Sequence, residues 1–381
     1  EAYNADTRAD KVNLGVGVYY NDEGKIPVLR AVREAERARI EAATPRGYLP
    51  IEGIGAYDAA VQKLLFGEGS ALIAEGRLAT AQALGGTGAL KIGADLLKRI
   101  QPNATVLISN PSWENHRAIF EGAGFKVDTY PYYDASTHDL DFAGMEAALR
   151  GAGPDAIVVL HACCHNPTGV DLSADQWRTV TGIARERRFI PFLDLAYQGF
   201  GEGIDADGIA VRLFGEAGVP LFVSSSFSKS FSLYGERVGA LTIAATSKDE
   251  ATRVLSQLKR VIRSNYSTPP THGGSIVAAV LTDARLRALW EQELAEMRDR
   301  IKQMRSRFVE GLKARGVAQD FSFVLRQRGM FSYSGLSAAQ VERLRSEFGI
   351  YAVSSGRICV AALNSKNIDY VLDAIASLLR R

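Results

Sequence analysis

The stretch Ser224-Ser225-Ser226-Phe227-Ser228-Lys229-Ser230-Phe231-Ser232 follows an apolar run at 220–223. The run predicts a buried strand, and the serines predict a loop at its end that carries one amine. In α/β proteins, ligands bind outside the carboxyl ends of the strands. A lysine held there, partly out of water, can lose its proton and attack a carbonyl carbon. The alternative is a solvated surface lysine beside a serine-rich loop, the more common setting of this residue.

The composition is typical of a globular chain with an ample core. Of 381 residues, 46% are hydrophobic. Lys and Arg number 45 and Asp and Glu 43, and this net charge of +2 gives no support to nucleic acid or an anionic membrane as partner. No run approaches the roughly 18 apolar residues of a membrane helix. Three cysteines, two of them adjacent, fit a reducing cytosol, so we expect a cytoplasmic protein.

Short apolar runs alternate with helical segments along most of the chain. This alternation predicts βαβ units and an α/β fold with a mostly parallel sheet. The expected strands are 105–109, 126–130, 156–160, 190–193, 221–225 and 239–245. The expected helices include 87–99, 114–122, 173–187 and 248–263.

The last hundred or so residues predict a second, smaller domain. Residues 283 to about 314 form one long amphipathic pattern, which predicts a helix that joins the two domains. After it we expect strands at 321–325, 330–333, 351–353 and 358–361 and helices at 338–348 and 367–381, a small α+β domain. The predicted large domain is 27–297, and the small domain is 1–26 with 298–381.

Two loops are candidate ligand sites. Gly85-Gly86-Thr87-Gly88-Ala89-Leu90 opens a predicted helix, where glycines and free N–H groups suit a phosphate, although many such runs are ordinary loop-to-helix joints. The run 161–169, His-Ala-Cys-Cys-His-Asn-Pro-Thr-Gly, ends in a turn with an exposed amide. A zinc site at His161, Cys163 and His165 is not favoured, because side chains at period two on one strand lie about 6 to 7 Å apart. We therefore expect no metal.

An acid and an arginine complete a pattern for one ligand. Asp194 follows the apolar run 190–193. A carboxylate buried there is costly without a cationic partner. The alternative is that Asp194 caps a helix or a turn. Arg237 can grip a phosphate with two hydrogen bonds. A phosphate loop, an acid for a ring nitrogen and a lysine for an aldehyde together match pyridoxal phosphate.

The chain resembles the aspartate/aromatic aminotransferase group of fold-type I pyridoxal phosphate enzymes. The resemblance extends from about Asp10 to the C-terminus, and its motifs occur in order at 13–19, 48–53, 85–90, 110–116, 161–169, 194–200, 225–239, 263–267 and 355–357. It implies a large domain with a mostly parallel seven-stranded sheet between helices, beside the small α+β domain. It also implies a homodimer with shared active sites.

The resemblance assigns a role to each site residue. Lys229 bonds covalently to the cofactor and moves the substrate proton, Asp194 pairs with the ring nitrogen, and Trp113 stacks on the ring. Tyr197 and Asn166 meet the phenolic oxygen. The phosphate is held by Gly86, Thr87, Ser226, Ser228 and Arg237, with Tyr48 from the neighbouring subunit. Substrate is bound by Gly17, Trp113, Asn166 and Arg357, and by Arg263 of the partner subunit. His116 lies below Trp113 and His161 near the Asp194 side of the ring, and neither has a catalytic role.

The resemblance implies a ping-pong transamination between amino acids and 2-oxo acids. Arg263 implies that aspartate, glutamate and 2-oxoglutarate are accepted. Thr268 stands where aspartate-restricted relatives often carry Asn, and Phe227 replaces a common Tyr. We therefore predict an aminotransferase for aromatic amino acids and aspartate, the alternative being an aspartate enzyme with little aromatic activity. More remote alternatives are a ligand-binding domain of a regulator and a phosphate-binding protein without covalent chemistry.

Overall fold

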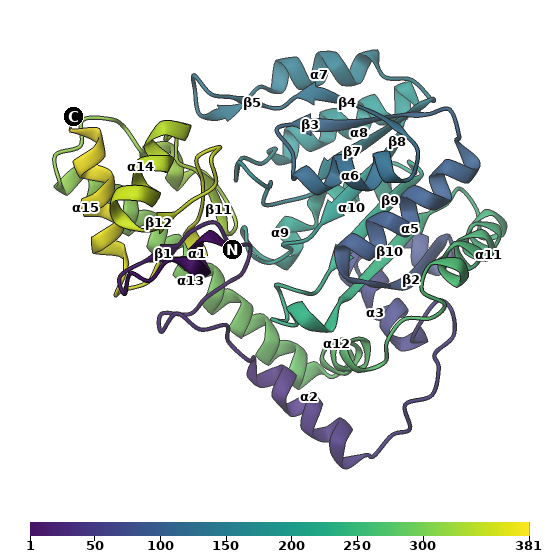
Figure 1. The fold of residues 1–381 in the computed structure, drawn as a ribbon. Helices are drawn as coiled ribbons and strands as arrows, with labels where there is room; N and C mark the ends of the chain where they lie inside the picture. Colours follow the sequence, from purple (N-terminus) through teal and green to yellow (C-terminus); the bar gives the residue numbers. More distant parts are fainter. Residues whose placement is uncertain (381) are drawn as a thin grey trace.

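A seven-stranded sheet forms the centre of the larger lobe in the computed structural model, which describes residues 1–380 (Figure 1). In spatial order its strands are β2 (Leu78–Leu84), β10 (Val238–Ala244), β9 (Leu221–Ser226), β8 (Ile190–Leu195), β7 (Ala156–His161), β3 (Thr105–Asn110) and β4 (Lys126–Pro131). Only β10 runs antiparallel to its neighbours. This architecture confirms the predicted α/β class.

Strand β2 lies outside the ranges predicted from the sequence. Its residues, Leu-Ala-Thr-Ala-Gln-Ala-Leu, are rich in alanine, which has little preference for strands. It forms because β10 pairs with it along its whole length, from Val238 opposite Leu84 to Ala244 opposite Leu78. Tertiary pairing therefore decides this element.

Helices cover both faces of the sheet. Along β7, Ile157 and Val159 join one buried cluster, whereas Val158 and Leu160 join the other. The first cluster packs under α5 (Gly85–Ile100), α6 (Glu114–Gly122) and α11 (Lys248–Asn265). The second packs under α3 (Gly55–Phe66), α8 (Ala174–Arg187), α10 (Ile209–Glu216) and α12 (His272–Thr282). Because side chains alternate along a strand, a wholly apolar strand supplies both cores.

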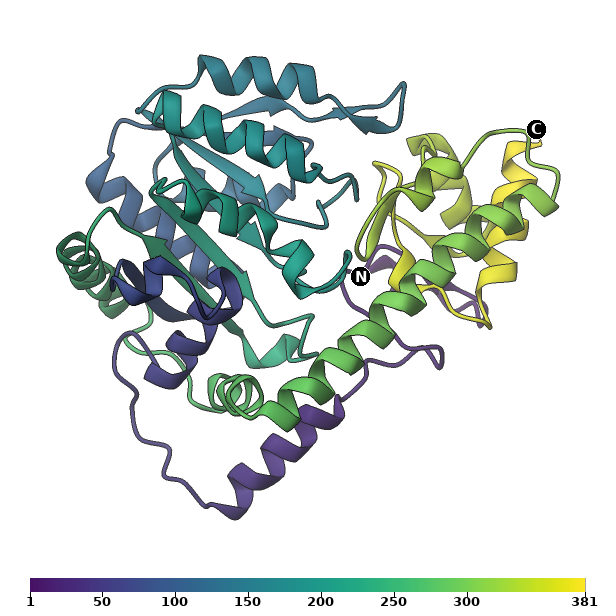
Figure 2. The same cartoon turned by 180° about the vertical axis from the view of Figure 1, so that it is seen from behind.

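Helix α13 (Ala284–Ala314) is a long helix that connects the larger lobe with a smaller one (Figure 2). Asp283 caps it by accepting a hydrogen bond from the Leu286 N–H. The smaller lobe holds β11 (Phe331–Tyr333) antiparallel to β13 (Arg357–Cys359), β1 (Val12–Asn13) parallel to β12 (Ile350–Tyr351), and the helices α14 (Ala338–Phe348) and α15 (Ile368–Leu379). The domain boundaries at 27 and 297 stay predictions, and Arg381 lies outside the described residues.

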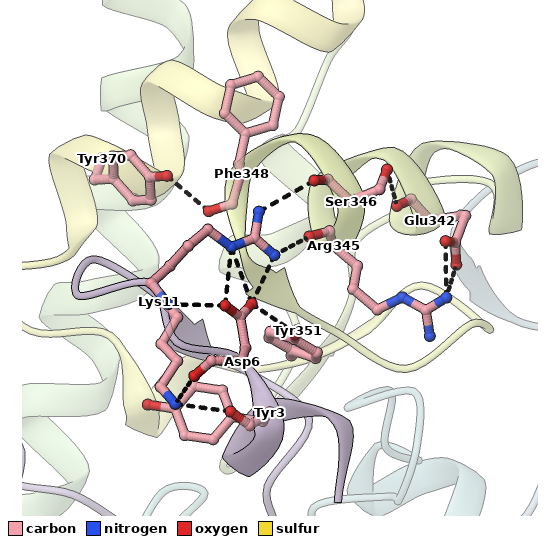
Figure 3. Close-up of polar contacts among 10 residues, drawn as sticks. Tyr3, Asp6, Lys11, Glu342, Arg345, Ser346, Phe348, Tyr351 and Tyr370 are labelled. Carbon is pink, nitrogen blue, oxygen red and sulfur yellow. Dashed lines mark hydrogen bonds and ion pairs between the residues drawn. The ribbon is translucent and has the colours of Figure 1, made fainter.

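The N-terminal segment is fixed to the smaller lobe by polar contacts (Figure 3). The Asp6 carboxylate accepts hydrogen bonds from the Arg8 guanidinium and, at 2.7 Å, from the Tyr351 hydroxyl. Arg8 also donates to the carbonyl of Ser346. The two ends of the sequence therefore build one lobe.

The remaining elements are short, and one prediction among them is wrong. They are α1 (Ala2–Ala5), α2 (Arg30–Glu41), α4 (Ala71–Ala74), α7 (Phe142–Gly151), α9 (Ile204–Asp207), and the hairpin β5 (Tyr133–Asp134) with β6 (Asp139–Leu140). The predicted strand 321–325 is instead a 3-10 helix, Ser322–Leu325. The Asp320 carboxylate starts this turn by accepting from the Ser322 N–H and hydroxyl. In residues 1–380, no helix is long and apolar enough to cross a bilayer.

Candidate active site

A cavity of about 330 Å³ lies at the carboxyl ends of the central strands. Its wall includes most of the predicted site residues: Gly17, Gly86, Thr87, Trp113, Asn166, Asp194, Tyr197, Ser226, Ser228, Lys229, Arg237 and Arg357. Gly17 and Arg357 come from the smaller lobe, so both lobes build the cavity. This is the place where α/β folds bind ligands.

Lys229 lies in a tight loop after β9. Backbone hydrogen bonds from Ser232 to the Lys229 carbonyl and from Leu233 to the Ser228 carbonyl close the loop. The Trp290 indole donates to the Ser230 carbonyl at 2.7 Å and so fixes the loop from behind. The Lys229 amine lies 4.9 Å from the centre of the Tyr197 ring.

The charge of Lys229 responds to three neighbouring influences. Burial lowers the pKa of its amine, the Asp194 carboxylate raises it, and Arg237 lowers it again, with a net lowering. A larger share of this amine is therefore neutral than for an exposed lysine, and the neutral form is the nucleophile and the base.

The start of α5 forms a cradle for an anion. The first N–H groups of a helix have no partner within the helix and favour negative charge. Gly85 has φ +68°, and a Cβ added there would lie 2.4 Å from Arg237 Nη2. Glycine is therefore required so that the guanidinium can approach the helix start. Arg237 Nη1 also lies 3.4 Å from the Ser228 hydroxyl.

Asp194, at the end of β8, is joined to a directed chain of hydrogen bonds. The Asn166 N–H donates to His161 Nδ1 at 3.2 Å, so neutral His161 carries its proton on Nε2, 3.3 Å from the Ser112 hydroxyl. The Ser112 hydroxyl also lies 2.8 Å from His116 Nδ1. His116 Nε2 then donates to Asp194 at 2.7 Å.

This chain keeps Asp194 ionised. Burial alone raises the pKa of Asp194, but the hydrogen bond and the charge of His116, followed by the charge of Lys229, outweigh burial, and the net pKa lies below its ordinary value. Burial, followed by the neighbouring His165 and His116, lowers the pKa of His161 well below its usual range, so its ring is neutral. A carboxylate that stays ionised in a buried site can pair with a cation.

Arg357, on β13, lines the cavity with a guanidinium that neighbouring groups hold in place. Its Nη1 donates to the Asn166 side-chain oxygen and its Nη2 to the Gly15 carbonyl, each at 3.0 Å. Its Nε is buried and has no hydrogen-bond partner among residues 1–380. The guanidinium lies 4.4 Å from the centre of the Phe331 ring. A guanidinium in a cavity wall is suited to bind a carboxylate.

Two predicted residues lie away from the cavity of this chain. Tyr48 is 97% exposed. Arg263 lies in the last turn of α11, where its guanidinium contacts the Ser267 hydroxyl on the surface. Neither side chain reaches Lys229 within one chain.

The cavity also includes residues for which the sequence indicated no individual role. They are Leu90, Glu114, Cys164, Ala196, Tyr234 and Phe331, and Cys163 lines the cavity beside them. Phe331 lies within the predicted strand 330–333, but no local pattern indicates that its ring covers Arg357. The structure does not bring His161, Cys163 and His165 together as metal ligands, because the His161 and His165 rings stack at 4.1 Å. The ring nitrogens of His165 meet Ser109 and Thr168 instead.

Comparisons with known proteins show the family of this chain. The family model "Aminotransferase class I and II" matches residues 9–375. An aspartate aminotransferase of Pseudomonas aeruginosa is 66% identical over 379 residues, covering 100% of this chain and 95% of the relative. An aromatic-amino-acid aminotransferase of Escherichia coli is 52% identical over 382 residues, covering 100% and 96%.

A solved structure with a related sequence has nearly the same fold. The crystal structure of an aromatic-amino-acid aminotransferase from Burkholderia pseudomallei, covalently bound to pyridoxal phosphate, is 70% identical with a TM-score of 0.98. The match covers 99% of this chain and 95% of that one.

Proposed function

Because the chain belongs to the class I and II aminotransferase family, we propose that it transfers the amino group of aromatic amino acids and aspartate to 2-oxoglutarate, with pyridoxal phosphate as cofactor. One observation carries the proposal: the amine of Lys229, the Asp194 carboxylate and the Arg357 guanidinium line a single cavity. Relatives named for aspartate and for aromatic substrates match over the whole chain.

The donors in the cavity fit the cofactor. Arg237, the Ser226 and Ser228 hydroxyls, Gly86 and Thr87 would hold its phosphate at the start of α5. Asp194 would hold the protonated ring nitrogen, and Trp113 would stack on the ring. Burial raises the pKa of Tyr197, so its phenol stays protonated and can donate to the phenolic oxygen. Because the Asn166 oxygen accepts from Arg357, its amide nitrogen is left to donate there too.

Lys229 would carry the proton in the reaction. The bound cofactor supplies an aldehyde that captures the substrate amine and a ring that accepts the electrons of the broken Cα–H bond. The neutral Lys229 amine would take the proton from the substrate Cα and deliver it to the aldehyde carbon of the cofactor. Asp194 favours this step because its carboxylate stabilises positive charge at the far side of the ring.

Arg357 would orient the substrate. Its guanidinium lines the cavity and would bind the substrate carboxylate, and Asn166 keeps the guanidinium in place. Gly17, which also lines the cavity, would contact the substrate beside the Phe331 ring. These contacts hold the α-carboxylate, which amino acids and 2-oxo acids share.

A second copy of the chain would complete each site. Tyr48 would reach the partner's phosphate, and Arg263 would meet the side-chain carboxylate of a dicarboxylic substrate. The exposure of Val28 at 64%, Ile40 at 70% and Tyr48 at 97% supports a homodimer, because such apolar surface favours a partner. All three cysteines are free thiols, which suits the cytoplasm that we propose as location.

The substrate range is tested by an amino-donor panel. With 2-oxoglutarate as acceptor, we expect kcat/KM for tyrosine and phenylalanine within about tenfold of that for aspartate, a difference of about 1.4 kcal/mol. Aromatic values far lower would favour the alternative, an aspartate aminotransferase. Whichever substrates are preferred, Phe227 would influence that preference only indirectly, because its side chain is buried against Tyr57 and Phe231.

The assignment of Lys229 is tested by reduction. Borohydride should fix the cofactor on a peptide that contains Lys229, and Lys229→Ala should lower turnover by at least about 10³-fold, since both the covalent link and the base are lost. The control is Lys248→Ala, a lysine at the exposed start of α11. Undiminished transamination by Lys229→Ala would overturn the assignment. Absence of turnover in the wild-type protein would favour a regulator.

A further inference from the structure

Two adjacent thiols, Cys163 and Cys164, lie side by side in the wall of the cavity. A regular strand would point neighbouring side chains to opposite faces. Here β7 ends at His161, and Cys164 has φ +51°, which turns its side chain back toward that of Cys163. Both thiols are buried and both line the cavity. The loop, and not the strand, creates this pair.

Asp207, at the end of α9, is a third donor. The two sulfur atoms and one Asp207 carboxylate oxygen all lie within 4.8 Å of one another. Asp207 Oδ2 accepts from the N–H groups of Gly199 and Gly201, and Oδ1 accepts from that of Glu202. These bonds hold the carboxylate in place and leave one lone pair free, on Oδ1. Among the described residues, no ion pair neutralises it.

We propose that Cys163, Cys164 and Asp207 form a binding site for one soft divalent cation, of the class of Zn²⁺ and Cd²⁺, with its fourth position open to the cavity. Two sulfurs and one carboxylate oxygen are donors that such ions accept, and three protein ligands with one open position are typical of accessible sites.

The charge balance of the site favours an ion of this kind. Each metal–sulfur bond forms as a thiol releases its proton to solvent, so two protons leave as one divalent ion enters, and nothing is oxidised or reduced. The formal charge of the buried site is therefore unchanged. An added net charge would be costly there, because the site already lies near the buried acids Asp207 and Asp171 and near Arg305, the cation that faces the thiols.

Protons compete with the ion. Both thiols must lose their protons to bind the ion, so the affinity for the ion should increase with pH.

An ion there would affect the neighbouring substrate site. Gly329 packs on Cys164 so closely that a Cβ would lie 2.9 Å from the sulfur. The Cys164 thiol lies 3.8 Å from the Tyr197 carbonyl oxygen. Gly329 leads into Phe331, whose ring covers Arg357. Ligation of Cys164 should therefore inhibit turnover as well as bind the ion.

The test is titration of the reduced holoenzyme with Cd²⁺. We expect the ultraviolet absorption of a thiolate-to-cadmium bond to saturate at one ion per chain and to strengthen as the pH rises from 6 to 8, because fewer protons then compete with the ion. Zn²⁺ should displace it. This absorption does not depend on turnover. The metal site can therefore be disproved while the proposed aminotransferase activity is confirmed, and the activity can be disproved while the metal site is confirmed.

Three variants locate the site. Cys163→Ser and Cys164→Ser should each weaken Cd²⁺ binding by at least about 100-fold, because each loses a thiolate ligand. The matched control is Cys359→Ser, a buried cysteine that contacts the Val18 carbonyl, and it should keep the absorption. Circular dichroism of each variant checks folding, and Cys164→Ala replaces a variant that does not fold. Absence of the band in wild type, or its loss only in Cys359→Ser, would overturn the proposal.

Discussion

At the scale of single residues, the ionised groups of the cavity are set by contacts with residues distant in sequence. Asp194 is 78 residues from His116 along the chain, yet their hydrogen bond decides that the carboxylate stays charged. Lys229 is kept closer to neutrality by burial. The pair therefore combines a stable negative charge with an amine that can accept a proton, as acid–base chemistry requires.

Asp58, on α3, is a buried acid outside the cavity. Burial and the nearby Glu52 raise the pKa of Asp58 to about 9. The unfolded carboxyl ionises near pH 4, so between about pH 4 and pH 9 rising pH favours the unfolded chain by up to about 1.4 kcal/mol per unit. Asp58 Oδ1 also has no hydrogen-bond partner among residues 1–380. The Asp58 carboxyl therefore lowers the free energy of unfolding at neutral pH.

We therefore expect Asp58→Asn to stabilise the protein by about 2 kcal/mol or more at pH 8, and by less at pH 5. Urea unfolding at the two pH values measures the difference. Glu68→Gln, whose side chain is 84% exposed, is the control and should change little. An equal gain at pH 5 and pH 8 would contradict the raised pKa.

At the scale of elements, the start of α5 depends on a glycine that Arg237 requires. Gly85→Ala would strain a residue at φ +68° and push the guanidinium from a position 2.4 Å from the new Cβ. We expect the affinity of the apoenzyme for pyridoxal phosphate to fall at least about tenfold, which is about 1.4 kcal/mol. Titration followed by visible absorption measures it.

Gly151→Ala is the matched control for that experiment. Gly151 ends α7, and a Cβ added there meets nothing within 4 Å. It should leave cofactor affinity unchanged. Unaltered affinity in Gly85→Ala would mean that Arg237 does not hold the phosphate.

Helix α13 is tied to the segment before β11 by a buried arginine. Arg305 donates at 2.7 Å to the carbonyls of both Gly329 and Phe331, at 3.2 Å to that of Val324, and also to the Ser332 hydroxyl. Burial lowers its pKa to about 10. These carbonyl dipoles take the place of a carboxylate and fix the strand that carries Phe331.

Arg305→Lys keeps the positive charge but loses the planar guanidinium, whose several N–H groups donate in fixed directions. We expect it to cost about 2 kcal/mol or more of stability, because several buried carbonyls lose their donor, and to raise KM through a displaced Phe331. Urea unfolding and steady-state kinetics measure the two effects. Arg307→Lys, exposed on the same helix, is the control. A change in stability with no change in KM would show that Arg305 does not set the position of Phe331.

At the scale of the whole molecule, shared active sites can be tested by mixing two inactive variants. Lys229→Ala and Arg263→Ala each damage both sites of their own dimer. In a mixed dimer, one site receives an intact Lys229 from one chain and an intact Arg263 from the other. After co-refolding, we expect activity with aspartate to recover to about a quarter of wild type, from the random pairing of chains. No recovery in dimers shown to be mixed would place both residues in the same chain's site.

Much of the fold follows from local patterns. The apolar run at 156–160 predicts β7 because a strand buried on both faces needs a continuous apolar sequence. The long amphipathic pattern predicts α13 to within a residue of its observed bounds, Ala284–Ala314. The range 321–325 has an apolar pattern too, but the Asp320 side chain and the buried Arg305 turn it into a 3-10 helix.

The residue types of the site and their order can be recognised in the amino-acid sequence: a lysine after one strand, an acid after another, and a glycine-rich helix start. Their resemblance to a known family indicates the chemistry. Which side chains meet depends on how the distant segments pack. Arg357 contacts Asn166 across 191 residues of chain, Phe331 covers Arg357, and Cys164 turns toward Cys163 and Asp207. The physical reason is that local patterns record backbone preference and burial, whereas a site depends on contacts that form only when distant segments pack.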